Sequence, residues 1–291
     1  NGPNLLHTVN LDRDPADDGS YTFYGGAYTW LAPQGGELGW RDEEGELQNW
    51  PPDPAMDSGP SAVVGRSMHR LLMENPRSRD GLVQRKAIEL TAVHELTLTY
   101  ELVNESEDTV RRAHWINTAA SPDSIIALRL REGESAAQLY ATEEGHAERL
   151  GSLLSAVDDN GWALLKLSDL HFEGGIKVYT DGPAEIAIWV PNPDWLRTRG
   201  FWLHRTLAEP MEVEQRNELR TLGEGPVALY LNPGLELFEA ELYGPVVDIE
   251  GGDSATLTEI WTVYVAPTPL TRFMSEQYRL PAQPKGFFES R

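Results

Sequence analysis

The residues best suited to chemistry are two glutamates late in the chain. Glu239 and Glu241 stand two positions apart in a stretch that reads as a strand, so their side chains point to the same face. Leu235, Leu237 and Tyr243 share that face. Two carboxylates on a partly apolar face raise the pKa of at least one of them. Such a pair is expected where protons are transferred or hydroxyl groups are bound, and a solvated outward face is the alternative.

A second group of candidates lies in a proline-rich stretch. Residues 40–60 contain Trp40, Trp50 and four prolines, which predicts a long loop, and the acidic residues 12–20 predict another. Long loops on a rigid β scaffold often carry binding groups. The tryptophans could stack on a sugar ring, whose apolar face suits a flat aromatic. Alternatively, they pin the loop to the body of the protein.

Three arginines suggest recognition of an acidic ligand. Arg66, Arg70 and Arg205 could each hold a carboxylate, because the guanidinium group forms bidentate pairs. In so acidic a chain they could instead pair with neighbouring Asp or Glu. His171 and His204 lie among aromatic residues, with no spacing that assigns them a role. No zinc or calcium spacing is found, and the absence of cysteine excludes disulfides and thiolate nucleophiles.

The charge balance restricts the partners. The chain has 46 acidic and 24 basic residues, a net charge of −22, which would repel nucleic acid and anionic membranes. No apolar run reaches the roughly 18 residues of a membrane span. The acidic, Lys-poor composition fits a periplasmic or extracellular protein, although a GC-rich genome would also favour Arg over Lys. The start at Asn1 suggests that strands preceding it are missing.

Strand patterns dominate the chain. Leu96, Leu98, Tyr100 and Leu102 alternate with polar residues within 94–104, the period of a half-buried strand. Further strands are predicted at 82–90, 110–118, 125–130, 138–142, 162–167, 176–180, 185–190, 227–231, 235–243 and 255–265. Helical periodicity is scarce. We therefore predict an all-β fold, a large antiparallel two-sheet sandwich forming a single domain over residues 1–291.

The order of several motifs resembles galactose mutarotase-like domains. The segments are 1–6 (NGPNLL), 25–34 (GGAYTWLAPQ), 74–82 (ENPRSRDGL), 96–117 (L-x-L-x-Y-x-L-x-N, then H-W-x-N) and 238–261 (FEAELYGP to W). The most similar family within that superfamily is an uncharacterised bacterial domain of unknown function. The resemblance implies a supersandwich with a concave sugar-binding face. It does not by itself imply an activity.

The resemblance also implies site residues. Mutarotases use a general acid and a general base to open a sugar ring; His114 matches the second histidine of the family and Glu241 its late glutamate, with Glu239 beside it. A structural histidine is the alternative for His114, and Trp115 is expected in the core. The first histidine of the family is absent, because Tyr28 and Trp30 occupy its neighbourhood.

These observations leave three functions open. The first is a carbohydrate-active enzyme, such as an epimerase, with His114, Glu241 and Glu239 as catalytic residues. The second is a non-catalytic module that binds mono- or oligosaccharides, and the third is a structural role with a closed cleft. No organic cofactor and no metal are expected. The candidate sugar-binding residues are Tyr28, Trp30, Gln34, Trp50, Arg66 and His69.

Overall fold

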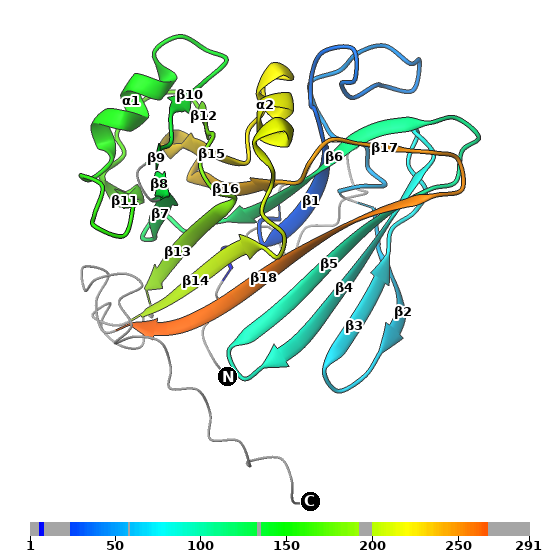
Figure 1. The fold of residues 1–291 in the computed structure, drawn as a ribbon, viewed down its shortest axis with the longest axis horizontal. Helices are drawn as coiled ribbons and strands as arrows, with labels where there is room; N and C mark the ends of the chain where they lie inside the picture. The colour runs from blue at the N-terminus through cyan, green and yellow to red at the C-terminus, as the bar shows by residue number, and fades with distance from the viewer. Residues whose placement is uncertain (1–5, 9–23, 58, 133–134, 192–199, 267–291) are drawn as a thin grey trace, which may run out of the picture.

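The computed structural model describes residues 6–8, 24–57, 59–132, 135–191 and 200–266. Two large antiparallel sheets make up most of this part of the chain (Figure 1). The seven-stranded sheet has the order β1 (Ala27–Ala32), β6 (Val110–Ala119), β16 (Leu237–Tyr243), β15 (Val227–Asn232), β12 (Ile176–Thr180) and β10 (Leu139–Tyr140), and β17 (Val247–Ile249) also pairs with β6. The predicted all-β two-sheet sandwich is therefore confirmed. The domain boundaries 1–291 stay a prediction.

The second sheet is wider. Its nine strands have the order β11 (Trp162–Lys166), β7 (Ile125–Arg129), β13 (Glu185–Pro191), β14 (Gly200–Leu207), β18 (Ser254–Ala266), β5 (Glu95–Asn104), β4 (Leu82–Ala92), β3 (Arg70–Glu74) and β2 (Ala62–Arg66). Figure 1 shows most of it as a broad fan running from β13 to β2. A two-stranded sheet, β8 (Arg131–Glu132) with β9 (Ser135–Ala136), lies apart from both.

The two faces of the seven-stranded sheet have different environments. One face, here called the inner face, is turned to the nine-stranded sheet: Leu31 packs with Leu82 and Leu102, and the His114 ring lies 6.4 Å from that of Tyr100. The opposite, outer face is defined by the register of the strands. Its members include Tyr28, Trp30, Trp115, Asn117, Lys177, Tyr179, Glu239, Glu241 and Tyr243.

Two short helices complete the described part. Helix α1 (His146–Leu153) contacts β10 and β12, and α2 (Val213–Thr221) begins with a capping box between Glu212 and Gln215. Single turns of 3-10 helix, η1 (Leu167–Asp169) and η3 (Pro233–Leu235), follow β11 and β15. None of the helices in the described residues is long and apolar enough to cross a membrane.

The predicted strands are found, with shifts of a few residues at their ends, and some strands were missed. Strand β14 is a central strand whose residues are buried on both faces, so its sequence shows no alternation of apolar and polar residues. The predicted loop at 40–60 is confirmed for its described residues, where the only pairing is an isolated bridge between Arg41 and Leu47. The predicted loop at 12–20 lies outside the described residues.

Candidate functional site

The outer face gathers acids, aromatics and one lysine from four strands. In the register of the sheet, Glu241 of β16 is opposite Asn117 of β6, and Tyr243 is opposite Trp115. Lys177 of β12 lies on the same face across β15. These residues are far apart in sequence and meet because β6, β16, β15 and β12 are neighbours in the sheet.

Glu241 is completely buried, and its two carboxylate oxygens differ in their hydrogen-bond partners. Oε2 accepts hydrogen bonds from Trp115 Nε1 at 2.8 Å and Tyr243 OH at 2.9 Å, and it forms an ion pair with Lys177 Nζ at 3.1 Å. Oε1 is buried and has no hydrogen-bond partner in the described part of the chain. A buried carboxylate oxygen without a donor is costly, so it marks a place where a ligand donor would be stabilising.

Lys177 is held between this carboxylate and aromatic rings. Its Nζ lies 3.7 Å from the centroid of the Trp115 ring, and 5.6 Å and 5.8 Å from those of Tyr179 and Tyr243. The negative faces of aromatic rings attract an ammonium group, most strongly when it is desolvated. The outer face therefore already binds one ammonium group, that of the protein itself.

Glu239 has a contrasting environment. It is buried, and Tyr28 OH donates a hydrogen bond to its Oε1. Burial, followed by repulsion from Glu241, raises the pKa of Glu239 to about 8. Glu239 is therefore protonated at neutral pH and can donate a proton, while Glu241 two positions away is paired with a cation.

A third acid was not predicted from the sequence. Glu224 follows α2 and accepts a hydrogen bond at Oε1 from the backbone N–H of Gln34 at 3.2 Å, and the Tyr179 hydroxyl group is a further donor to its buried carboxyl group. Burial raises its pKa, and Lys177 opposes that rise. The turn residues around Glu224 carry no signal that could have found it. Lys177 could have been found, because it lies two positions before Tyr179 on a predicted strand and so shares its face.

Asn117 adds a further unpaired group. It is completely buried at the centre of the outer face, opposite Glu241 in one strand pair and Tyr28 in the other. Neither its Nδ2 nor its Oδ1 has a partner among the described residues. Buried amides are normally hydrogen-bonded, so this side chain also indicates a ligand.

The tryptophans take two roles. Trp40 is buried, stacks on Trp115 at 5.7 Å and donates from Nε1 to the carbonyl oxygen of Leu31 at 2.7 Å, so it pins the loop to the sheet. Trp30 contacts Trp115 edge to face at 4.9 Å and donates to Asp57 Oδ1 at 2.6 Å. Trp50 is 49% exposed and lies 5.5 Å from Trp30. Of the loop tryptophans, Trp50 is the one that presents aromatic surface at the rim.

His114 does not join this group. It stands three positions before Asn117 in β6, so it points to the inner face, where it is opposite Leu31. Burial lowers its pKa to about 4, and Tyr100 backbone opposes that shift. The structure therefore does not bring His114 and Glu241, the two predicted catalytic residues, to one face of the sheet. Trp115 lies in the main hydrophobic core, as expected, and its ring is on the outer face of the seven-stranded sheet.

The three arginines do not join the outer face either. Arg66, His69 and Arg70 are exposed on the β2–β3 hairpin at the edge of the nine-stranded sheet, and Arg70 lies 4.0 Å from Glu89. Arg205 is completely buried between the sheets with Glu259. Arg205 thus forms the pair with an acidic residue that was the alternative expectation, and a carboxylate-binding role for the exposed Arg66 and Arg70 stays a prediction. Gln34 is connected to the site through its backbone contact with Glu224.

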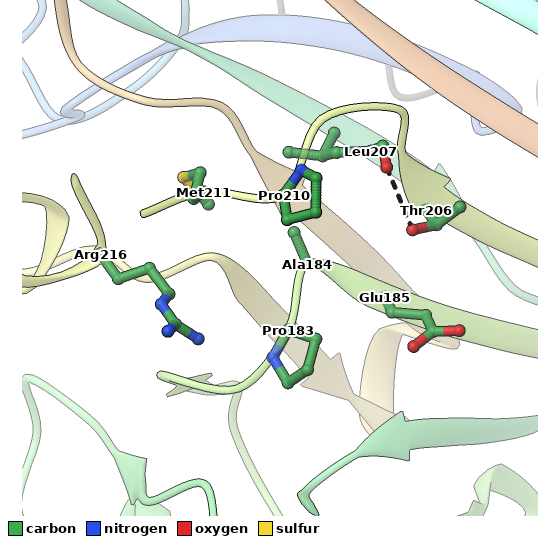
Figure 2. A pocket seen from close by; sticks show the side chains of 8 residues that line it. All are labelled: Pro183, Ala184, Glu185, Thr206, Leu207, Pro210, Met211 and Arg216. Carbon is green, nitrogen blue, oxygen red and sulfur yellow. Dashed lines mark hydrogen bonds between the residues drawn. The ribbon is translucent and has the colours of Figure 1, made fainter. Parts of the chain in front are cut away.

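Two further results concern metal sites and other pockets. Within the described residues, no three His, Asp or Glu side chains form a group that could hold a metal ion. A separate pocket of about 180 Å³ lies where β13 begins and β14 leads into α2 (Figure 2). Its charged residues are already engaged: Glu185 contacts His204 at 2.8 Å, and Arg216 donates to the carbonyl oxygen of Asp181 at 3.4 Å. None of the predicted site residues lines it.

No protein-family model and no curated protein matches this chain. Several solved structures do. One is described as an aldose 1-epimerase from Escherichia coli, at 14% identity over 70% of this chain and 68% of the other, with a TM-score of 0.37. Another is a galactose mutarotase-like protein from Lactobacillus casei, at 10% identity over 70% and 72%, TM-score 0.44. A third is a TPR-domain containing protein from Parabacteroides distasonis, at 10% identity over 91% and 41%, TM-score 0.43.

Other matches are also described as galactose mutarotase-like or related proteins. These descriptions agree with the family that the sequence motifs resemble. At this similarity they do not identify a substrate or a reaction, and the functional argument rests on the outer face itself.

Proposed function

We propose that this protein binds a carbohydrate on the outer face of the seven-stranded sheet and transfers protons on it through Glu239 and Glu241. One observation carries the proposal: two buried carboxyl groups share a face but have opposed environments. Glu239 is protonated at neutral pH, whereas Glu241 has a cation at one oxygen and no partner in the described chain at the other. Carboxyl groups in such different environments are the usual pattern of an acid and a base.

The chemistry that fits this pair is opening and closing of a sugar ring at the anomeric carbon. Glu241 Oε1 would take the proton of the anomeric hydroxyl group, and the new carbonyl bond would form as the bond from the anomeric carbon to the ring oxygen breaks. Glu239 would give its proton to that ring oxygen. Return of both protons after rotation about the adjacent bond would close the ring in the other anomer. Asn117 would bind a neighbouring hydroxyl group, since its amide has both a donor and an acceptor to offer.

The aromatic surroundings support a sugar as the ligand. Trp50 is half-exposed at the rim of the face that holds the carboxyl groups, beside the buried Trp30, so its ring is the one that a sugar can reach. Flat aromatic rings bind the apolar faces of pyranoses, while acids and amides bind their hydroxyl groups. The sequence motifs that resemble galactose mutarotase-like domains support the same class of ligand.

A specific observation favours the alternative of binding without catalysis. Two hydrogen bonds and the ion pair with Lys177 already fix Glu241 Oε2, an arrangement that also suits a carboxylate that only orients a ligand. The same arrangement would still hold a sugar hydroxyl group at Oε1. The two functions use the same binding site and differ in whether the bound sugar reacts.

Proton NMR with freshly dissolved aldoses tests both. Catalysis predicts faster anomer exchange with the wild-type protein, lost in Glu239→Gln and Glu241→Gln and kept in Glu107→Gln, an exposed control outside the site. Sugar line broadening without faster exchange, weakened by the same two variants, would support the binding module. If no aldose showed faster anomer exchange or line broadening, the proposal would be overturned.

A further inference from the structure

The outer face contains more acids than its cations can satisfy. Glu224, Glu239 and Glu241 share one ammonium group, that of Lys177, which acts electrostatically on all three. Asp57, hydrogen-bonded to Trp30, adds negative charge that also acts on Glu239. No arginine among the described residues of the outer face offsets this excess.

The unpaired atoms at the site are mostly acceptors. Glu241 Oε1 and Asn117 Oδ1 are buried without partners in the described part of the chain, against one unpaired donor, Asn117 Nδ2, while the buried Glu224 has the Tyr179 hydroxyl group as a neighbouring donor. A ligand that satisfies this set must bring hydrogen-bond donors. The strongest donor to a buried carboxylate is a cationic N–H group, because charge assistance roughly doubles the strength of the bond.

The aromatic rings favour the same kind of group. Trp115, Tyr179 and Tyr243 already surround the ammonium of Lys177, at 3.7–5.8 Å from their centroids. Trp30 meets Trp115 edge to face and borders Trp50. Trp115 and Tyr243 are buried and stacked on each other, so the ring that offers exposed surface to a further cation is that of Trp50.

We infer that the sugar bound at this face carries a positive charge, so that an amino sugar binds more tightly than its neutral counterpart and a uronic acid binds least. This inference rests on the proposed function, since it names the class of carbohydrate for the same site. The ammonium group would lie between Glu241 Oε1 and Glu224 Oε2, and the remaining hydroxyl groups would contact Asn117 and Glu239.

Binding of a cation has a consequence that binding of a neutral sugar lacks. A nearby positive charge lowers the raised pKa of Glu239 toward neutrality, so protons are released to the solvent. The groups acting on Glu239 are Tyr28, Glu241, Lys177 and Asp57. These groups are the same in the complexes with a neutral sugar and with an amino sugar. Proton release would therefore depend on the charge of the ligand.

Isothermal titration calorimetry tests the inference with matched probes: glucose, glucosamine and glucuronate, then galactose, galactosamine and galacturonate. At pH 6.5 we expect each amino sugar to bind at least tenfold more tightly than its neutral counterpart and the uronate not to bind. At the same pH, where the amino sugars themselves stay protonated, titration in two buffers of different ionisation enthalpy should show proton release with the amino sugars alone. Glu224→Gln should reduce the preference, and Glu107→Gln should leave it unchanged.

The outcomes separate the two proposals. Equal or tighter binding of the neutral sugars in both series would overturn the inference and leave the proposed function standing. Methylammonium serves as a probe that does not depend on sugar recognition, because it should quench tryptophan fluorescence by binding at the same rings. If methylammonium binds in wild type but not in Glu241→Gln while no sugar binds, the cation site stands and the carbohydrate function fails. If neither methylammonium nor any sugar binds, both fail.

Discussion

Glu259 and Glu241 are both completely buried, and the difference between them separates a structural acid from a candidate functional one. Glu259 lies between the sheets, where Arg205 Nε donates to its Oε1 at 2.6 Å and Tyr100 OH to its Oε2 at 3.0 Å. Glu241 lies on the outer face with three donors on one oxygen and none from the described chain on the other. Burial is equal in the two regions, so the unpaired atoms, rather than burial, distinguish the site.

The Arg205–Glu259 pair also helps to hold the two sheets together. Besides Glu259, the guanidinium of Arg205 donates from Nη1 to the carbonyl oxygen of Ala240 in the facing sheet at 2.7 Å. It therefore connects the two sheets through their interior. Both charges of the Arg205–Glu259 pair are compensated by the protein, which leaves neither of them to a ligand.

Arg205→Met gives the largest expected effect. It leaves Glu259 buried with Tyr100 as its remaining donor and removes the contact to Ala240, so we expect a loss of about 3–5 kcal/mol in the free energy of unfolding. Urea denaturation at pH 7 measures it. Arg220→Met, which removes a more exposed pair with Asp181, is the control and should change stability by less than about 1 kcal/mol. Equal stability of the two variants would show that the inner pair is no more structural than a surface pair.

Glu239→Gln should change how stability depends on pH. The folded-state pKa of about 8 exceeds the ordinary 4.5, so the folded protein holds this proton more tightly, and the resulting stabilisation is lost as pH rises from about 4.5 to 8. Gln resembles the protonated acid and does not titrate. We expect the variant to match wild type near pH 4.5 and to exceed it by on the order of 2–3 kcal/mol at pH 8.5.

Urea denaturation across that pH range, with Glu107→Gln as the control for loss of one acid, measures this difference. A constant offset between Glu239→Gln and wild type would mean that Glu239 has an ordinary pKa. The acid proposed for the reaction would then be ionised at neutral pH, and its role as proton donor would be untenable.

Lys177→Met compares the cation of the outer face with Arg205, the cation between the sheets. Glu241 keeps the hydrogen bonds from Trp115 and Tyr243, and Met can still pack on the ring, so we expect a loss of about 1–3 kcal/mol at pH 8. Without the ammonium group, burial raises the pKa of Glu224 further, and proton uptake reduces the penalty at pH 5. Urea denaturation at both pH values measures this. A loss as large as that of Arg205→Met at both would place Lys177 among the structural pairs.

The sequence predicted what depends on local pattern. The alternation along β5 and the shared face of Glu239 and Glu241 follow from the period of two in a strand, and both are found. The site as a whole depends on the neighbours of β16, and strand order is a long-range property that no local pattern contains. Lys177 and Glu224 reach Glu241 only because β12 and the segment after α2 lie where they do.

The separation of His114 from Glu241 has a different origin. The motif resemblance matched a residue type, whereas two residues of a strand share a face only when they are an even number of positions apart. His114 and Asn117 are separated by three positions, so they cannot share a face of β6. Counting from Asn117 would have selected Trp115, the residue that contacts Glu241.

Trp50→Ala should have a modest effect confined to binding. The ring is half-exposed at the rim beside Trp30, so its loss removes stacking area from a sugar without opening the core. We expect three- to tenfold weaker sugar binding, about 0.7–1.4 kcal/mol, with little change in stability. Calorimetric titration measures the affinity, and Met68→Ala, which removes a 90% exposed side chain at the β2–β3 turn, is the control. Unchanged affinity would exclude the rim tryptophan from the site.

His114→Leu should have the smallest effect on function. The side chain points between the sheets, its Nε2 has no partner among the described residues, and its pKa of about 4 keeps it neutral at physiological pH. Leu removes an unpaired buried polar atom and one contact to the backbone of Tyr100, so stability should change by about 1 kcal/mol or less. Sugar affinity and anomer exchange should stay within twofold of wild type between pH 5 and 8. A marked loss of exchange in this variant, without loss of stability, would return His114 to the reaction and mean that the inner face communicates with the outer one.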